Sequence, residues 1–389
     1  MKITDVRTAV VRGNFDWVLV RVYTDEGLVG LGEAYWGAGV EAAVRWLKPV
    51  LEGENPLEIE WLFSKMMRHM SGGNSQAGTM VAAISGVEIA LWDLAGKALG
   101  VPIYRLLGGK YRDRVRVYAD SHHGAKPEPS AWADRAREVV VKGFTALKFD
   151  IDNTDPARFL EREAIGLGRA WNKSNLRPLS AAELEHMVKL VAALRQAVGG
   201  EIDLAIDAHW GYNTLDAIRM AQAFEPFHLM WLEDPVPPGN WEAMARVTAA
   251  TTTPICTGEN LYTRLGLRDL IVNQACDILQ VDIPKAGGLL ESKKIADMAD
   301  SYFMPFAAHN VCSPIGTTAG VHVCATMRNF YLLEFYAQDV EWWDDLVTRE
   351  EPLIQEGYVA VPEEPGLGLE LNEDVARAHL APGSTYFEG

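Results

Sequence analysis

Eight short apolar segments recur along the second part of the chain, and their rhythm constrains the fold more than any other feature. Most are separated by stretches with helical patterning, such as 129–143 and 289–301. Alternating strands and helices form a parallel sheet covered by helices, and eight such units predict a (β/α)8-type barrel. A dinucleotide-binding sheet is the rival fold, but no GxGxxG motif follows an early strand. The predicted strands are 115–121, 146–152, 202–209, 229–235, 254–260, 278–284, 302–310 and 330–336.

The residues on either side of this region predict two further parts. Residues 1–114 have the pattern of an α+β domain, which begins with strand-like alternation and becomes mostly helical from Val40 to Leu99. We expect the barrel over 115–340 and a separate C-terminal segment over 341–389.

One connection in the predicted barrel is unusually long. About 50 residues separate Asp152 from Asp203, where about 20 would be usual for a strand–helix–strand connection. The sequence S-A-A-E predicts that the helix of this unit begins at Ser180, with Glu183 completing a capping box. The insertion at 153–179 follows a strand end, so we expect either a flap that faces the substrate or a surface excursion.

Charge and composition exclude several classes of partner. The chain has 36 Lys and Arg against 53 Asp and Glu, a net charge of −17. This balance argues against nucleic acid or an anionic membrane as the main partner. No secretory signal pattern and no run of about 18 apolar residues is present, which predicts a cytoplasmic protein without a membrane span. The four cysteines form no CxxC pair and are expected to be buried free thiols.

Ionisable side chains stand at the ends of the third to the eighth predicted strands. Their spacing is between 23 and 27 residues, so one such group recurs in each strand–helix unit. In order along the chain they are Asp207 with His209, Glu233, Glu259, Asp282, His309 and Glu334.

In a barrel these strand ends converge on one axis, where three adjacent carboxylates would repel one another strongly. A divalent cation resolves this repulsion, and ligation by oxygen alone favours Mg²⁺ or Mn²⁺ over zinc. A single acid at such a junction is more often a helix N-cap than a ligand. Five such acids at strand ends, each inside an apolar segment, are harder to explain as helix caps.

Several longer motifs carry a resemblance to a known family. Together they are similar to the enolase superfamily, mandelate racemase subgroup, over almost the whole chain. The motifs are AISGVEIALWDLAGKALGVPIYRLLGG (83–109), IDAHWGYN (206–213), WLEDP (231–235), TGEN (257–260), VDIPKAGGL (281–289) and AAHN (307–310).

The resemblance implies a barrel with a capping domain. The N-terminal α+β part would form this domain and the C-terminal segment would return to complete it. Loops at Asn14–Trp17 and Ser71–Gln76 would then close over the substrate and set its specificity.

The resemblance also implies a metal site and a catalytic pair. Asp207, Glu233 and Glu259 match the ligands of Mg²⁺, for which Mn²⁺ is a possible substitute. His309 with Asp282 matches the His–Asp dyad of the subgroup, in which the carboxylate orients the imidazole and raises its basicity.

Two further groups have expected roles in charge stabilisation. Removing a proton next to a carboxylate creates a dianionic enediolate, which Mg²⁺ and a nearby lysine can hold. Lys148 is the candidate lysine; the alternative is that it only neutralises Asp150 or Asp152. Glu334 matches the eighth-strand acid that hydrogen-bonds the substrate carboxylate.

Two features of the sequence narrow the expected reaction. Racemases of the subgroup carry Lys-x-Lys at the second strand, whereas this chain has Lys148-Phe149-Asp150, which argues against proton transfer between two faces of one carbon. His209 lies two residues after Asp207, so strand alternation would place both on one face. Asp-x-His here resembles the acid-sugar dehydratases of the subgroup, and a structural role for His209 is the alternative.

These features predict a hydro-lyase that acts on an aldonate such as gluconate, galactonate, xylonate or arabinonate. One histidine would remove the C2 proton and the other would protonate the departing 3-hydroxyl, giving a 2-keto-3-deoxy acid. We favour His209 as base and His309 as acid, with the reverse left open. An epimerase, racemase or cycloisomerase is the alternative enzyme, and a non-catalytic sugar-acid binding protein is a remote one.

The substrate pocket and the assembly are less constrained by sequence. The resemblance suggests a homo-oligomer between a dimer and an octamer. The residues expected to line the pocket are Asp150, His122, His123, Asn310, Trp210 and Trp17.

Overall fold

The computed structural model describes residues 1–70, 76–121, 128–151 and 178–388. His122, His123, most of the loop predicted at 71–76 and nearly all of the insertion predicted at 153–179 lie outside the described residues.

The chain divides into two compact units, which are described separately. Unit 1 comprises residues 1–116, 259–267 and 281–389, and unit 2 comprises 117–258 and 268–280. The domain boundaries expected from sequence, after residues 114 and 340, stay predictions.

Unit 1 begins with the α+β domain that the sequence predicts. A three-stranded antiparallel sheet has the order β1 (Ile3–Arg12), β2 (Asp16–Thr24), β3 (Val29–Ala34). The mostly helical region forms three helices, α1 (Val40–Leu51), α2 (Ile59–Met70) and α3 (Thr79–Leu99).

The sheet packs closely on α3 because β3 carries glycines where the two backbones meet. A Cβ atom at Gly30 would lie 2.0 Å from the Ala90 carbonyl oxygen, and one at Gly32 would lie 2.4 Å from that of Gly86. Among the described residues, α3 is the one helix long and apolar enough to span a membrane, but 89% of its apolar window is buried inside the protein. It is therefore the core helix of this domain.

The second part of the chain forms the predicted barrel. Its strands are hydrogen-bonded in the order β11 to β4, and β11 also pairs with β4, which closes the sheet. All eight predicted strands are confirmed, each within a few residues of its expected bounds. They are β4 (Arg114–Asp120), β5 (Ala146–Asp150), β6 (Asp203–Asp207), β7 (Trp231–Glu233), β8 (Ile255–Thr257), β9 (Ile278–Asp282), β10 (Phe306–His309) and β11 (Phe330–Phe335).

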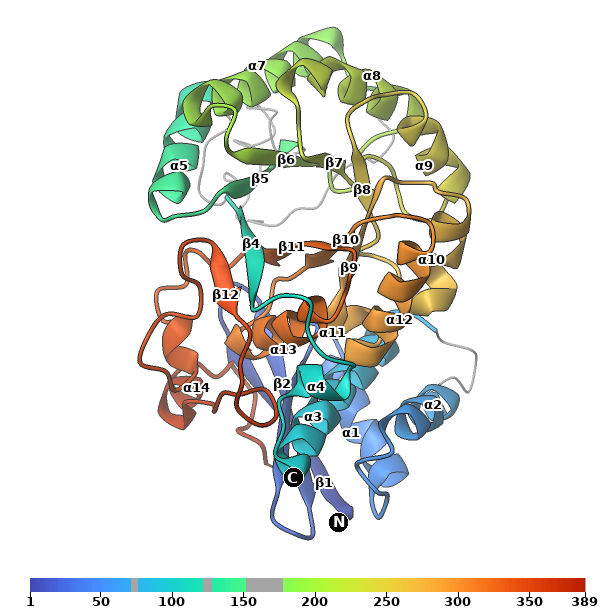
Figure 1. Ribbon diagram of the computed structural model, residues 1–389, viewed down its shortest axis with the longest axis vertical. Coiled ribbons are helices and arrows are strands. Elements are labelled where there is room, and N and C mark those ends of the chain that lie inside the picture. The colour runs from blue at the N-terminus through green and yellow to red at the C-terminus, as the bar shows by residue number, and fades with distance from the viewer. Residues whose placement is uncertain (71–75, 122–127, 152–177, 389) are drawn as a thin grey trace. The chain divides into compact units, whose positions relative to one another are not determined.

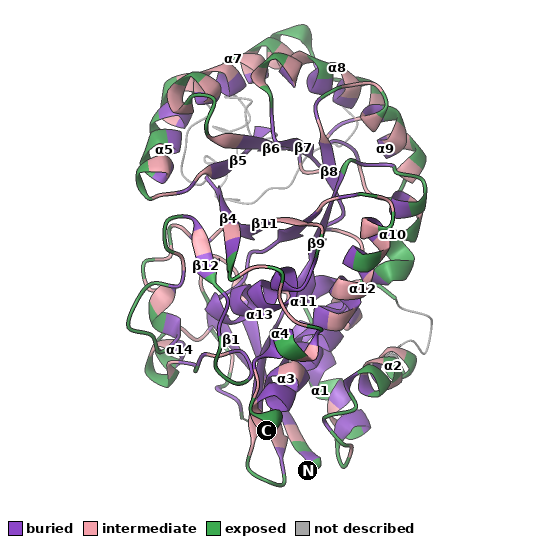
Figure 2. Cartoon of the chain, in the orientation of Figure 1, coloured by how far each residue is buried: buried purple, intermediate pink, exposed green. Residues whose placement is uncertain are grey.

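In unit 2 the helices α5 (Pro129–Val141), α7 (Ala181–Val198), α8 (Thr214–Phe224) and α9 (Trp241–Thr248) lie outside strands β5 to β8 (Figure 1). Their buried faces point toward the strands and their exposed faces point away (Figure 2). The predicted capping box at the start of α7 is confirmed, because the Ser180 hydroxyl accepts from the Glu183 backbone and the Glu183 carboxylate accepts from the Ser180 backbone.

Shorter elements complete the chain. A ninth strand, β12 (Tyr358–Ala360), runs antiparallel to the first residues of β4, with Tyr358 opposite Arg116. The remaining elements are α4 (Ile103–Leu106), η2 (Glu225–Phe227), α10 (Thr263–Val272), α11 (Ile283–Ala286), α12 (Gly288–Asp300), α13 (Pro314–Ala325), η3 (Asp344–Leu346), β12 (Tyr358–Ala360) and α14 (Glu373–Ala378).

A buried carboxylate on α3 holds the start of α12 within unit 1. Glu88 accepts hydrogen bonds from the backbone N–H groups of Leu289 at 2.8 Å and Leu290 at 3.0 Å, and from the Trp92 indole at 2.7 Å. The carboxylate thereby satisfies two backbone N–H groups that the first turn of a helix leaves without an internal partner. Burial nevertheless raises the pKa of Glu88 from 4.5 to about 7.

We predict that Glu88→Gln lowers the free energy of unfolding by about 1–3 kcal/mol, because an NH₂ group replaces an oxygen that accepts from backbone N–H groups. Because folding raises the pKa of Glu88 from 4.5 to about 7, its contribution to stability declines as pH rises through that range. Urea denaturation at several pH values measures both effects. The exposed Glu58→Gln is the control, and an equal loss in the two variants would contradict this account.

Candidate active site

A buried lysine lies among three carboxylates at the strand ends of unit 2. Lys148 on β5 is 1% exposed, and its Nζ atom lies 3.0 Å from Asp207 Oδ2 on β6 and 3.0 Å from Glu233 Oε1 on β7. Asp120 Oδ2 on β4 lies 3.6 Å away. The parallel register brings them together, since Asp120 pairs with Lys148 and Asp207 with Glu233. The ammonium group therefore bridges two of the predicted metal ligands.

These carboxylates fit the donor set of a hard divalent cation. The side chains of Asp207 and Glu233 are buried, and with Asp120 they exceed the charge of Lys148 by two. Buried carboxylate oxygens with excess negative charge are ligands that Mg²⁺ accepts. The third predicted ligand, Glu259, belongs to unit 1 and is described with it.

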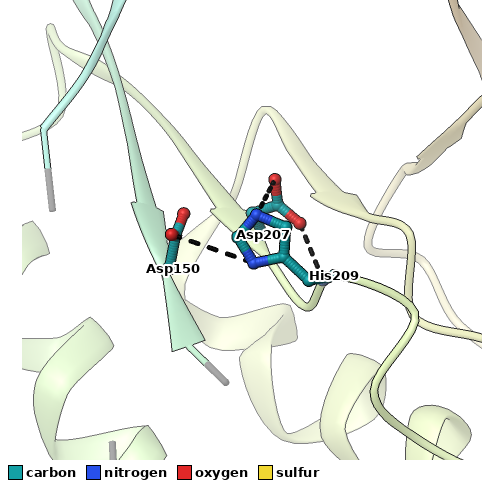
Figure 3. Close-up of side chains that lie close together, drawn as sticks. All are labelled: Asp150, Asp207 and His209. Atoms are coloured by element: carbon teal, nitrogen blue, oxygen red, sulfur yellow. Dashed lines mark hydrogen bonds and ion pairs between the residues drawn. The ribbon is translucent and has the colours of Figure 1, made fainter. Parts of the chain in front are cut away.

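His209 lies beside the same cluster. Its Nε2 atom is 3.5 Å from Asp207 Oδ2, and its Nδ1 atom is 3.8 Å from Asp150 Oδ2 (Figure 3). Among the described residues, these three side chains form a group that could hold a metal ion, with one ligand atom from each within 4.8 Å of the others. Asp150, expected to line the substrate pocket, thus contacts His209.

The predicted reason for the proximity of His209 and Asp207 is wrong. Strand β6 ends at Asp207, and His209 and Trp210 have φ values of 41° and 48°, in the left-handed region. His209 therefore lies on a turn after the strand, where alternation of faces no longer applies. Its backbone N–H donates to Asp207 Oδ1 at 2.8 Å, which closes this turn. The Trp210 ring stands edge-on to the imidazole, with centroids 5.7 Å apart.

Unit 1 carries a second cluster, built around a histidine. His309 at the end of β10 lies with Nδ1 2.6 Å from Asp282 Oδ2 on β9. Its Nε2 atom lies 2.8 Å from Glu259 Oε2 and 3.7 Å from Glu334 Oε2 on β11. Burial lowers the pKa of His309, but the charges of Glu259 and Glu334 and the hydrogen bonds to Asp282 and Glu259 raise it well above 6.5. This arrangement stabilises a protonated imidazole.

Asn310 supports this cluster through its amide and backbone. Its backbone N–H donates to Glu334 Oε2 at 3.0 Å, and its Nδ2 atom donates to the Glu334 carbonyl at 3.0 Å and to Thr317 Oγ1 at 2.9 Å. Both amide protons are therefore used within the protein. Asn310 therefore positions Glu334, and its place in the substrate pocket stays a prediction.

The loop that follows His309 is held by two indoles. Trp17 is 1% exposed and its Nε1 atom donates to the Val311 carbonyl at 3.1 Å. Trp343 donates in the same way to the Cys312 carbonyl at 3.1 Å. Trp17, which the sequence predicts to lie at the substrate, thus supports the backbone that follows His309.

The same loop is anchored by a carboxylate from β3. Glu33 accepts hydrogen bonds from the backbone N–H groups of Ser313 and Gly316 at 3.0 and 2.9 Å, and from the Ser313 hydroxyl. These groups lie at the start of α13, so the carboxylate also faces the positive end of the helix. The N-terminal domain therefore fixes the segment that carries His309.

A partly buried hydrogen-bond chain leads from Lys285 to His309. The Lys285 Nζ atom donates to Asn260 Oδ1, and Asn260 Nδ2 donates to Glu259 Oε1, both at 2.8 Å. The other oxygen of Glu259 contacts His309. The ammonium also lies 4.5 Å from the centre of the Tyr35 ring, a favourable cation–π distance. The contact with Tyr35 and the link through Asn260 had no local signal in the sequence.

We predict that Lys285→Met lowers kcat by about tenfold or more, because a charge-assisted hydrogen bond worth about 1.5–3 kcal/mol no longer orients Asn260 and Glu259. Steady-state kinetics measures the change against Lys293→Met, a lysine on α12 that is paired with Asp297. Equal rates in the two variants would show that the chain does not position Glu259.

Comparison with known proteins supports this assignment of the fold. Residues 5–108 match the mandelate racemase / muconate lactonizing enzyme N-terminal domain, and residues 131–375 match the enolase C-terminal domain-like family. The chain belongs to the mandelate racemase/muconate lactonizing enzyme family. The expected membership of the enolase superfamily is confirmed, and members of that superfamily use Mg²⁺.

Two curated relatives are similar to this chain in sequence, and one solved structure is similar to it in fold. D-xylonate dehydratase from Haloferax volcanii is 47% identical over 100% of this chain and 91% of its own length. D-gluconate dehydratase from Thermoproteus tenax is 33% identical over 94% of this chain and 70% of its own length. A mandelate racemase/muconate lactonizing enzyme-like protein from Rubrobacter xylanophilus is similar in structure, with a TM-score of 0.91 and 44% identity over 100% of this chain and 99% of its own.

Proposed function

We propose that the protein is a Mg²⁺-dependent sugar-acid dehydratase that converts a five-carbon aldonate of the D-xylonate type into its 2-keto-3-deoxy acid. The observation that carries this proposal is a pair of imidazoles, His209 and His309, each flanked by carboxylates at strand ends of the barrel. Dehydration needs both a base and an acid. The identity of 47% to a D-xylonate dehydratase favours that substrate over gluconate, galactonate and arabinonate.

The metal in this proposal binds to Asp207, Glu233 and Glu259. Each carboxylate stands at or just after the end of a strand of one closed parallel barrel, and the carboxyl ends of such strands share one rim. Mg²⁺ at these ligands would supply positive charge to the carboxylate of the substrate and to the enediolate that forms from it. Lys148 contacts two of the ligands and adds a second positive charge near the carboxylate oxygens of the substrate.

The two histidines divide the proton transfers between them. His209 takes the proton from C2, and His309 gives a proton to the departing 3-hydroxyl, which leaves as water. The enol that remains tautomerises to the 2-keto-3-deoxy acid, so the reaction neither adds nor removes electrons overall. The raised pKa of His309, which follows from its three carboxylate neighbours, supports its role as the acid. Glu334 and Asp282 keep its ring in place.

Other reactions on this scaffold have less support. Racemases of the subgroup carry a second lysine on the second barrel strand, and in this chain that position holds Asp150, which contacts His209. Cycloisomerisation and simple binding of a sugar acid need no second imidazole. Cytoplasmic location and assembly into a homo-oligomer stay predictions, as does the absence of nucleic-acid and membrane partners.

We predict that His309→Asn and His209→Asn each reduce 2-keto acid formation by about 10²-fold or more, because each removes one partner in general acid–base catalysis. Semicarbazide detection across D-xylonate, D-arabinonate, D-gluconate and D-galactonate measures the product. The exposed His69→Asn is the matched control. Undiminished product in either catalytic variant would contradict the assigned pair.

We predict that Mg²⁺ raises the melting temperature of the unmodified protein and that Glu233→Gln abolishes this shift. The amide removes one charged oxygen from the ligand set, which weakens binding of a hard cation. Differential scanning calorimetry with and without Mg²⁺ tests this, and the exposed Glu242→Gln serves as control. A full Mg²⁺ response in Glu233→Gln would remove Glu233 from the ligand set.

A further inference from the structure

A cationic pocket lies in unit 1 at the amino-terminal ends of barrel strands. Its volume is about 470 Å³, which is within the range of small-molecule sites. Arg114 begins β4, whose other end carries Asp120, so about 20 Å of strand separates the pocket from the catalytic end. The lining residues are Arg112, Asp113, Arg114, Arg116, Phe330, Tyr331 and Tyr358.

The lining is positive in a protein whose net charge is −17. It contains three arginines and one carboxylate, and that carboxylate, Asp113, is already paired with Lys110 at 2.9 Å. Arg112 is fixed by hydrogen bonds from Nη1 to the carbonyls of Cys324 at 2.6 Å and Met327 at 2.8 Å. The pocket thus concentrates positive charge on a rigid part of the fold.

Aromatic rings hold two of the arginines in place. The Arg114 Cζ atom lies 4.0 Å from the centre of the Tyr358 ring, and Arg112 Cζ lies 5.1 Å from that of Phe330. A guanidinium that stacks on an aromatic ring contacts the ring with its flat face. Its N–H groups point outward in the plane of the guanidinium and stay available as donors. In the part of the chain that the structure describes, no carboxylate lies within ion-pair distance of Arg114. Its donors are therefore preorganised for an anion.

We propose that this pocket binds a compact organic anion with two or more negative charges, either a phosphate monoester or a polycarboxylate. The N–H fork of arginine matches the spacing of phosphate and carboxylate oxygens, and preorganised side chains lose less freedom on binding. Arg114 and Arg116 stand two residues apart on β4, so both side chains leave the same face of the strand. Such a site is separate from the catalytic rim and does not depend on the proposed reaction.

Isothermal titration calorimetry on the full-length protein, in buffer stripped of divalent ions, tests this proposal. The probes are inorganic phosphate, glycerol 3-phosphate and citrate at constant ionic strength. We expect one site, with binding weakened about tenfold or more in Arg114→Gln and in Tyr358→Leu, because each loses a charge-assisted contact or its support. Arg377→Gln is the control, since Arg377 also stacks on a tyrosine, with 3.7 Å between Cζ and the Tyr386 ring centre.

The probes separate the two sources of the anion. Tighter binding of glycerol 3-phosphate than of citrate identifies a phosphate ester, and the reverse identifies a polycarboxylate. Circular dichroism checks that the variants are folded. If Tyr358→Leu does not fold, the loss of binding in Arg114→Gln alone tests the proposal. No binding by any probe would overturn the proposal. Binding that survives Arg114→Gln but is lost in Lys148→Met would also overturn it, because the anion would then occupy the catalytic rim.

Discussion

Buried negative charge at the ends of the barrel strands is the constraint on which the two side-chain clusters depend. Each unit places three carboxylates around one positively charged or protonatable side chain, so each cluster keeps an excess of negative charge. Desolvated carboxylates at such distances are stable only with nearby cations and hydrogen-bond donors. This excess of negative charge is what a divalent cation would offset, and it raises the pKa of His309. The clusters are Asp120, Asp207 and Glu233 around Lys148, and Glu259, Asp282 and Glu334 around His309.

The supporting structure keeps these charges in fixed positions. Glu33 anchors the backbone after His309, and the indoles of Trp17 and Trp343 hold the same loop. Lys285 reaches Glu259 through Asn260, so a second positive group influences the cluster around His309 without touching His309. Glu33 and Trp17 of the N-terminal domain therefore restrain the loop that follows His309, which agrees with the fixed geometry that general acid–base chemistry requires.

The features that sequence predicted are those with a local or periodic cause. Alternating apolar strands and helices gave the barrel, and the capping box placed the start of α7 at Ser180 because its hydrogen bonds join residues three apart. The geometry of His209 was mispredicted because β6 ends at Asp207 and the backbone then turns through positive φ. The hydrogen bonds by which Trp17 and Asn310 hold neighbouring backbone could not be predicted from the sequence. Their partners are set by tertiary contacts, which leave no spacing pattern in the chain.

Exchange of the C2 proton of D-xylonate in deuterated water, followed by NMR together with product formation, tests the central claim most directly. If His209 is the base and His309 the acid, His309→Asn exchanges the C2 proton without releasing a 2-keto acid, and His209→Asn does neither. Unchanged exchange in His209→Asn would contradict this division of roles. Absence of both exchange and product in the unmodified, Mg²⁺-loaded enzyme would contradict the proposed action on D-xylonate itself.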